Sequence, residues 1–194
     1  MAVNREPEYL HGIPMTDEVF EHVIGMESPY RYELIDGLVY DMTGSSPEHG
    51  AISTNILTLL KQQLPKGGSC RVYEDQYVVI PGKPSVVPDI VLTCSLSDWD
   101  KSKRLKPFKI QSPLIVVEVL SPRTERYDRA EKFARYQSCP SLEIYMLVSQ
   151  DEPHVEIYRC ATGWKLELFL SDQVIKLDQL DLELPLAEIY EEVF

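Results

Sequence analysis

Two apolar segments with a helical segment between them constrain the fold of this chain more than any other feature. Residues 114–120 and 142–148 are each apolar apart from a single glutamate. Apolar runs of this length are typical of strands that are buried on both faces of a sheet. Residues 124–138 have the spacing of a helix, so we expect a crossover connection between two parallel neighbouring strands. The pattern therefore predicts an α/β fold with a mixed sheet.

The other elements are predicted from cap and turn residues. Ser or Thr at a helix start accepts a hydrogen bond from the first turn, and Asp-Gly favours a two-residue hairpin turn. No linker or repeat divides the chain, so we expect a single domain over residues 1–194. The expected order is a helix from Thr16, a hairpin over 31–42 around Asp36-Gly37, a helix from Ser46 to Gly67, strands over 71–80 and 86–93, the crossover unit, a hairpin over 154–170 and a helix over 186–193.

The four cysteines are scattered along the chain without a C-x-x-C pair, which excludes a zinc-finger or thioredoxin-type site. They are Cys70, Cys94, Cys139 and Cys160. A chain of 194 residues can bury enough apolar surface to be stable without disulfides or a structural metal. We therefore predict reduced, buried cysteines in a cytoplasmic protein. No apolar run approaches the roughly 18 residues of a membrane span, so no membrane partner is expected.

The charge of the chain is unevenly distributed. A formal net charge of -12 argues against a protein that coats nucleic acid by bulk electrostatics. Residues 101–135, however, contain ten basic and four acidic side chains. We expect the basic residues of 101–109 and 123–135 to contact phosphates, which positions a nucleic acid without reading its sequence.

One carboxylate lies in each of two apolar strands. Asp89 follows Val86-Val87-Pro88, and Glu118 interrupts the apolar run 114–120. An ionised carboxylate that is buried without a partner destabilises a fold, so each acid needs compensation. A divalent cation such as Mg²⁺ between adjacent strands would compensate both and could activate a water molecule. Alternatively, each acid lies at a strand end or pairs with an arginine of residues 123–135.

The helical segment 124–138 permits two interpretations. Its acid-before-base pairs at i, i+4 are typical of an exposed helix, with Lys132 as a surface salt-bridge partner. The pairs are Glu125–Arg129, Asp128–Lys132 and Glu131–Arg135. The buried face would then consist of Tyr127, Ala130, Phe133, Ala134 and Gln137. A second stripe that could border a cleft is formed by Arg129, Lys132, Phe133 and Tyr136. Periodicity leaves both faces open.

Several short motifs occur in a fixed order along residues 16–160. They are Tyr32-Glu33-Leu34-Ile35-Asp36-Gly37, His49, Val87-Pro88-Asp89-Ile90, Val117-Glu118-Val119-Leu120-Ser121-Pro122, then Asp128, Lys132 and Tyr136, and last Glu143-Ile144-Tyr145. Together these motifs resemble the Uma-two family of restriction-endonuclease-like proteins. The resemblance implies a PD-(D/E)xK nuclease core over about residues 46–150, to which an N-terminal helix and hairpin and a C-terminal hairpin are added.

The resemblance also implies roles for individual residues. Asp89 and Glu118 correspond to metal ligands, with the carbonyl of Val119 as a third and His49 on the helix where such nucleases often have another. The lysine expected two residues after Glu118 is replaced by Leu120. Family members that resemble this chain supply it from the crossover helix, at the position of Lys132. Three further candidate residues are Glu33, Asp128 and Tyr136.

The preferred hypothesis is a Mg²⁺- or Mn²⁺-dependent endonuclease that hydrolyses DNA phosphodiester bonds. Asp89 and Glu118 would hold the metal, and Lys132 would position water or neutralise charge on the phosphate. A homodimer is expected because cleavage of both DNA strands commonly uses two sites. One alternative is an inactive nuclease-fold interaction module, in which Lys132 points to solvent. Another is a two-carboxylate glycoside hydrolase, which would need an aromatic-lined cleft, although the chain has only two tryptophans.

Overall fold

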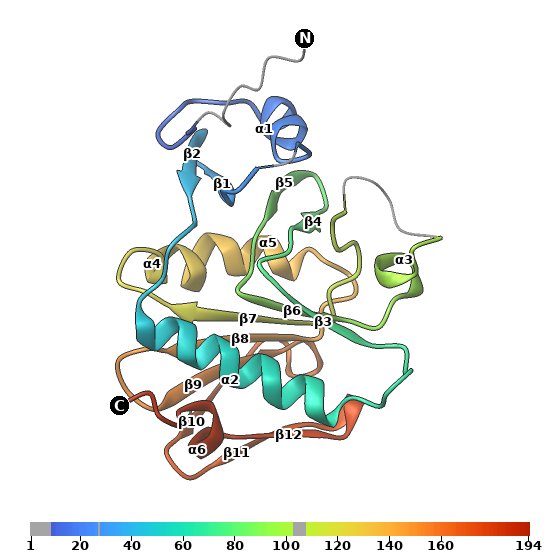
Figure 1. Ribbon diagram of the computed structural model, residues 1–194, viewed down its shortest axis with the longest axis vertical. Helices are drawn as coiled ribbons and strands as arrows, with labels where there is room; N and C mark the ends of the chain where they lie inside the picture. The colour runs from blue at the N-terminus through green and yellow to red at the C-terminus, as the bar shows by residue number, and fades with distance from the viewer. Residues whose placement is uncertain (1–8, 27, 103–107) are drawn as a thin grey trace.

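A six-stranded mixed sheet organises the computed structural model, which describes residues 9–26, 28–102 and 108–194 (Figure 1). The strands are β3 (Arg71–Glu74), β6 (Ile90–Thr93), β7 (Ile115–Leu120), β8 (Ile144–Ser149), β9 (His154–Arg159) and β10 (Leu166–Leu170). Their order is β10-β9-β8-β7-β6-β3, in which β7 and β8 are parallel and the other neighbours antiparallel. All six residues of β7 and of β8 are buried. The predicted α/β fold with a parallel crossover is therefore confirmed.

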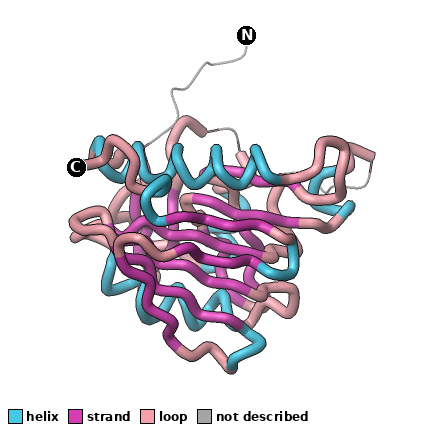
Figure 2. Tube along the Cα trace, turned by 90° about the horizontal axis from the view of Figure 1, so that it is seen from below, coloured by secondary structure: helices cyan, strands magenta, loops and turns pink. Residues whose placement is uncertain are grey.

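Helical segments lie on both sides of the sheet (Figure 2). One side carries α2 (Pro47–Gln63), α6 (Leu186–Ile189) and the two-stranded β11 (Val174–Leu177) and β12 (Leu182–Pro185). The opposite side carries the crossover, which consists of α4 (Glu125–Tyr127), a π-helical turn (Asp128–Lys132) and α5 (Phe133–Gln137). As predicted, Ser46 caps α2 by accepting a hydrogen bond from the His49 backbone N–H.

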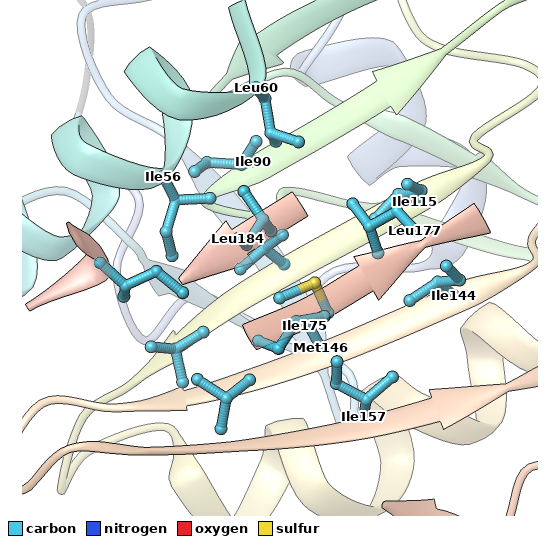
Figure 3. Close-up of a cluster of buried hydrophobic side chains, with 14 of the residues drawn as sticks. Ile56, Leu60, Ile90, Ile115, Ile144, Met146, Ile157, Ile175, Leu177 and Leu184 are labelled. Carbon is cyan, nitrogen blue, oxygen red and sulfur yellow. The ribbon is translucent and has the colours of Figure 1, made fainter. Parts of the chain in front are cut away.

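The residues of β7 alternate between two apolar clusters because successive side chains of a strand point to opposite faces. Ile115, Val117 and Val119 face α2. They pack with residues from β8, β9, β11 and β12, as Figure 3 shows for Met146, Ile157, Ile175 and Leu184. Val116 and Leu120 belong to the cluster on the crossover side. Glu118 shares their parity and therefore points toward the crossover helix.

An N-terminal unit lies beside the crossover. It contains α1 (Asp17–Val23), β1 (Tyr32–Ile35) and β2 (Leu38–Asp41), together with its own apolar cluster (Figure 1). Thr16 caps α1, and the predicted Asp36-Gly37 turn joins β1 to β2 with positive φ values of 50° and 75°. The hairpin of β4 (Val78–Ile80) and β5 (Lys83–Val86) lies next to this unit.

Several predicted elements are corrected. The strands expected over 71–80 and 86–93 are each split, because Asp75 adopts a positive φ of 49° after β3 and the chain leaves the main sheet to form β4 and β5. The segment 95–111, which contains the basic residues of 101–109, includes a short helix, α3 (Leu96–Trp99), and its residues 103–107 lie outside the described residues. The last helix ends at Ile189 rather than at residue 193. Two short 3₁₀ turns cover Cys160–Thr162 and Asp178–Leu180, and β11 and β12 were not predicted.

The prediction of four reduced cysteines is wrong. Arg71 on β3 pairs with Thr93 on β6, so the next residues outward, Cys70 and Cys94, oppose each other with their Cα atoms 3.9 Å apart and form a disulfide. Cys139 is free and buried as predicted, whereas Cys160 is free and exposed. Within the described residues, no helix is both long and apolar enough to cross a membrane.

Candidate metal and nuclease site

A cavity of about 680 Å³ opens between the start of α2, the end of β7 and the crossover helix. The loop that joins β2 to α2 and residues 121–124 complete its wall. Six of the predicted site residues line it, namely His49, Asp89, Glu118, Val119, Asp128 and Lys132. Glu33 and Tyr136 do not line the cavity. They are fully buried behind it.

The two predicted carboxylates lie opposite each other, with Asp89 at the strand end immediately before β6 and Glu118 on the neighbouring β7. Ile90 of β6 pairs with Val117 of β7 in antiparallel register, which places Asp89 across from Glu118. Asp89 Oδ2 accepts a hydrogen bond from the Val119 backbone N–H at 2.6 Å. His49 Nε2, from the first turn of α2, lies 3.3 Å from the same oxygen. The structure therefore brings together three side chains that are far apart in the sequence.

Lys132 is buried at the back of this pair, with only 1% of its surface exposed. Its Nζ atom lies 2.9 Å from both carboxylate oxygens of Glu118, 2.9 Å from the Val87 carbonyl oxygen and 3.0 Å from Glu33 Oε1. Asp128 Oδ1 is 3.6 Å away, one helical turn earlier. Burial alone would lower the pKa of Lys132, but the charges of Glu118, Glu33 and Asp128 raise it well above its ordinary value. The lysine is therefore a buried cation.

A stripe of polar residues on the crossover helix explains this position. Asp128, Lys132 and Tyr136 are buried, and Phe133 stacks on Tyr145 of β8. Of the face predicted from apolar spacing, Ala130, Ala134 and Gln137 are exposed. The interpretation of Lys132 as a surface salt-bridge partner is therefore wrong, whereas the second stripe contributes Lys132, Phe133 and Tyr136 to the side that faces the sheet. Residues Asp128–Lys132 form a π-helical turn, and such turns occur often at functional sites.

Burial also changes the acidity of the carboxyl groups. Desolvation raises the pKa of Glu118 well above its ordinary value, although the charge of Lys132 opposes the shift. Desolvation likewise raises the pKa of Asp128 to about 6. For His49, burial lowers the pKa, but the hydrogen bond and the charge of Asp89 more than offset this and raise it on balance. The pKa values of Glu118, Asp128 and His49 therefore all lie above those of the same groups in water.

The arrangement fits a hard divalent cation. Asp89 and Glu118 both line the cavity, and Lys132 lies beside both oxygens of Glu118. Carboxylate and carbonyl oxygens are the donors that Mg²⁺ and Mn²⁺ prefer. Among the described residues no group of three or more His, Cys, Asp and Glu side chains is arranged to hold a metal. A cation here would therefore depend on the two carboxylates together with backbone or solvent oxygens.

Two cavity residues were missed by sequence reasoning. Asp75 lies at the turn after β3, where burial and the neighbouring charge of Asp89 raise the pKa of its carboxyl group. Arg31, just before β1, reaches this turn and donates from Nε to the Asp75 carbonyl oxygen. The only sequence signal for Asp75 is the acidic pair Glu74-Asp75 within the strand expected over residues 71–80.

Most of the basic residues expected to contact phosphates are engaged within the protein. Lys109 pairs with Glu21, and Arg129 pairs with Glu125 and Glu156. Arg135 contacts Glu131 and donates to the Leu34 carbonyl oxygen. Lys103, Arg104 and Lys106 lie outside the described residues. Arg31 and Arg123 are the arginines that line the cavity among the residues described.

Comparisons with known proteins agree with this fold. A family model named Uma2 and described as "Putative restriction endonuclease" matches residues 17–187. The uncharacterized protein slr1290 of Synechocystis is 31% identical over 164 residues, which cover 82% of this chain and 83% of that protein. A second uncharacterized Synechocystis protein, sll1609, is 23% identical over 128 residues, with coverages of 66% and 71%. The crystal structure of a "putative nuclease belonging to DUF820" from Anabaena variabilis superposes with a TM-score of 0.72 at 19% identity, covering 93% of this chain and 100% of that one.

Proposed function

Because the chain belongs to the Uma2 family, described as a putative restriction endonuclease family, we propose that it hydrolyses DNA phosphodiester bonds with Mg²⁺ or Mn²⁺. Family membership supports a nuclease function in general. The observation that carries the finer proposal is the position of Lys132, whose Nζ atom lies 2.9 Å from Glu118 directly behind the opposed carboxylates Asp89 and Glu118. This arrangement joins a metal-binding pair to a buried positive charge.

In the proposed mechanism Asp89 and Glu118 hold the cation, with the Val119 carbonyl and His49 as further ligands. The chemistry supplied there by Mg²⁺ or Mn²⁺ is activation of a water molecule and stabilisation of negative charge on the phosphate. Four protein oxygens of Glu118, Val87 and Glu33 lie within 3.0 Å of Lys132 Nζ, so they engage all three of its ammonium protons. We therefore assign it to holding Glu118 in position and offsetting charge, rather than to direct contact with water.

The substrate is held by positive charge at the mouth of the cavity. Arg31 and Arg123 line its wall, and Arg123 donates a hydrogen bond to the Asp41 carbonyl oxygen at 2.7 Å. Arginine binds phosphate oxygens in forked geometry, so both are suited to contact a DNA backbone. Such contacts position the strand and carry no base specificity.

The structure disfavours both alternatives considered from the sequence. An inactive module predicts that Lys132 points to solvent, yet Lys132 is 1% exposed. A glycoside hydrolase requires aromatic residues in its cleft, but none of the described residues that line the cavity is Phe, Tyr or Trp. The homodimer and the cytoplasmic location stay predictions. Light scattering of the purified protein tests the first.

Cleavage of supercoiled plasmid tests the proposal. We expect nicking with Mn²⁺ or Mg²⁺, none with EDTA, and loss of nicking in Asp89→Asn and Lys132→Ala. Asp172→Asn is the matched control, because Asp172 is exposed in the loop after β10, and it should cleave like the wild type. Circular dichroism checks that each variant is folded. Absence of cleavage by the wild-type chain with either metal contradicts the proposal and favours an inactive interaction module.

A further inference from the structure

Glu33 is a buried carboxylate that comes from outside the nuclease core. It lies on β1 of the N-terminal hairpin, and its neighbours Tyr32 and Leu34 pack into the apolar cluster of the N-terminal unit. Because side chains alternate along a strand, Glu33 points the other way, toward the core. It is completely buried, and its Oε1 atom lies 3.0 Å from Lys132 Nζ.

A closed set of contacts links Glu33 to both halves of the candidate site. Glu33 Oε1 accepts a hydrogen bond from the Val87 backbone N–H at 2.7 Å. The carbonyl oxygen of Val87 accepts a hydrogen bond from Lys132 Nζ at 2.9 Å. Val87 is followed by Pro88 and then Asp89. One carboxylate therefore contacts both Lys132 and the segment that carries a proposed metal ligand.

A purely structural role explains this arrangement poorly. Glu33 Oε2 is buried without a hydrogen-bond partner. The single charge of Lys132 faces this carboxylate together with those of Glu118 and Asp128. A buried polar group with an empty acceptor destabilises the folded state, and apolar residues often replace buried ion pairs without loss of stability. The retained charge indicates that the orientation of Lys132 matters more than the stability of the core.

Resting on the proposed function, we propose that Glu33 is a positioning residue, through which the N-terminal hairpin completes the nuclease site. It fixes the ammonium group of Lys132 between β1 and β7, so that Lys132 in turn fixes Glu118. It also orients the Val87 peptide group and the Asp89 that follows. Groups that orient metal ligands in this indirect way typically affect activity or metal affinity by 10- to 100-fold.

Plasmid-cleavage kinetics with Glu33→Gln test this role. Gln retains the size of Glu and an acceptor for the Val87 N–H, but it removes the charge that faces Lys132. We expect kcat to fall by about 10- to 100-fold while KM for DNA stays within about twofold, because Glu33 does not line the cavity. The matched control is Glu18→Gln in α1, which is exposed in the same N-terminal unit and should keep the wild-type kcat.

A double-mutant cycle separates positioning from general stabilisation. If Glu33 acts mainly through Lys132, adding Glu33→Gln to Lys132→Met lowers kcat by a smaller factor than Glu33→Gln does in the wild type. Unchanged kcat in Glu33→Gln, or a loss that adds fully to that of Lys132→Met, overturns the proposal.

The wild type, Glu33→Gln, Lys132→Met and the double variant are also compared by urea unfolding, which does not depend on cleavage. Here Glu33→Gln should partly restore the stability lost in Lys132→Met, because it removes an uncompensated buried charge. An inactive wild-type chain would contradict the nuclease function alone. Additive unfolding energies would contradict the link between Glu33 and Lys132 whether or not the protein cleaves DNA.

Discussion

At the scale of single residues, Lys132 is held by carboxylates from two strands and from its own helix. Replacing it with methionine leaves Glu118 and Glu33 buried without compensation, and we expect the free energy of unfolding to fall by about 3–5 kcal/mol at neutral pH. Burial raises the pKa of Glu118 even beside Lys132, and loss of the lysine charge raises it further. A carboxyl group with a raised folded pKa supports the fold below its unfolded pKa and loses that contribution as the pH rises.

The defect of Lys132→Met should therefore be larger at about pH 8 than at about pH 5. Urea unfolding of both proteins at the two pH values measures this difference. An equal defect at both values would show that packing, rather than charge, determines the role of Lys132. Adding Glu118→Gln to Lys132→Met should recover part of the stability at the higher pH.

Candidate site residues could be found from the sequence where a charged residue interrupts an apolar segment. Asp89 and Glu118 stand out because acids interrupt apolar strands, and the structure places them opposite each other. Lys132 was assigned through family resemblance, since helical spacing left its direction open. The contact between Glu33 and Lys132 has no local signal, because it depends on how the hairpin packs against the core.

At the scale of elements, Glu21 fastens α1 to β5 and to the segment before β7. Its carboxylate accepts hydrogen bonds from Ser85 and lies 2.6 Å from Lys109 Nζ. Burial raises the pKa of Glu21, but these partners outweigh it and lower the pKa on balance. A lowered folded pKa stabilises the fold above the unfolded value and loses that effect as the pH falls through the folded value.

Glu21→Gln should therefore reduce stability at neutral pH by about 1 kcal/mol, a modest effect because solvent partly screens this ion pair. The difference from the wild type should shrink as the pH falls through the lowered pKa of Glu21, because the carboxylate then becomes protonated. Chemical unfolding over a series of pH values from neutral to acidic provides the measurement, with Glu18→Gln as the exposed control on α1. If the difference in unfolding free energy between Glu21→Gln and the wild type stayed constant over this pH range, the ion pair would be excluded as its cause.

Elements with a clean apolar period were predictable, whereas those that bury charge were not. The buried runs gave β7 and β8 their correct positions, and the caps at Thr16 and Ser46 located α1 and α2. The buried face of the crossover helix was left open between two stripes, because a 3.6-residue apolar period does not anticipate a buried lysine in a π-helical turn. The strands β11 and β12 do carry a signal, since buried Ile175 and Leu177 alternate with exposed residues.

At the scale of the whole molecule, the parallel crossover was predictable but the cross-links between strands were not. The crossover follows from connection rules that hold for most sheets. The pairing of Cys70 with Cys94 depends on the register between β3 and β6, which cysteine spacing does not reveal. The docking of the N-terminal unit onto the crossover is likewise a matter of surface fit between distant segments.

The Cys70–Cys94 disulfide should contribute to global stability, because it closes a loop between residues separated by 24 positions. Such a bond restricts the unfolded chain, so we expect Cys70→Ser/Cys94→Ser to lower the free energy of unfolding by about 2–4 kcal/mol. A reductant should bring the wild type to the level of the double variant and leave that variant unchanged. Cys160→Ser, at an exposed free thiol, should unfold like the wild type and keep its response to reductant. Alkylation of the unfolded, non-reduced protein should label Cys139 and Cys160 alone, and labelling of all four cysteines would contradict the bond.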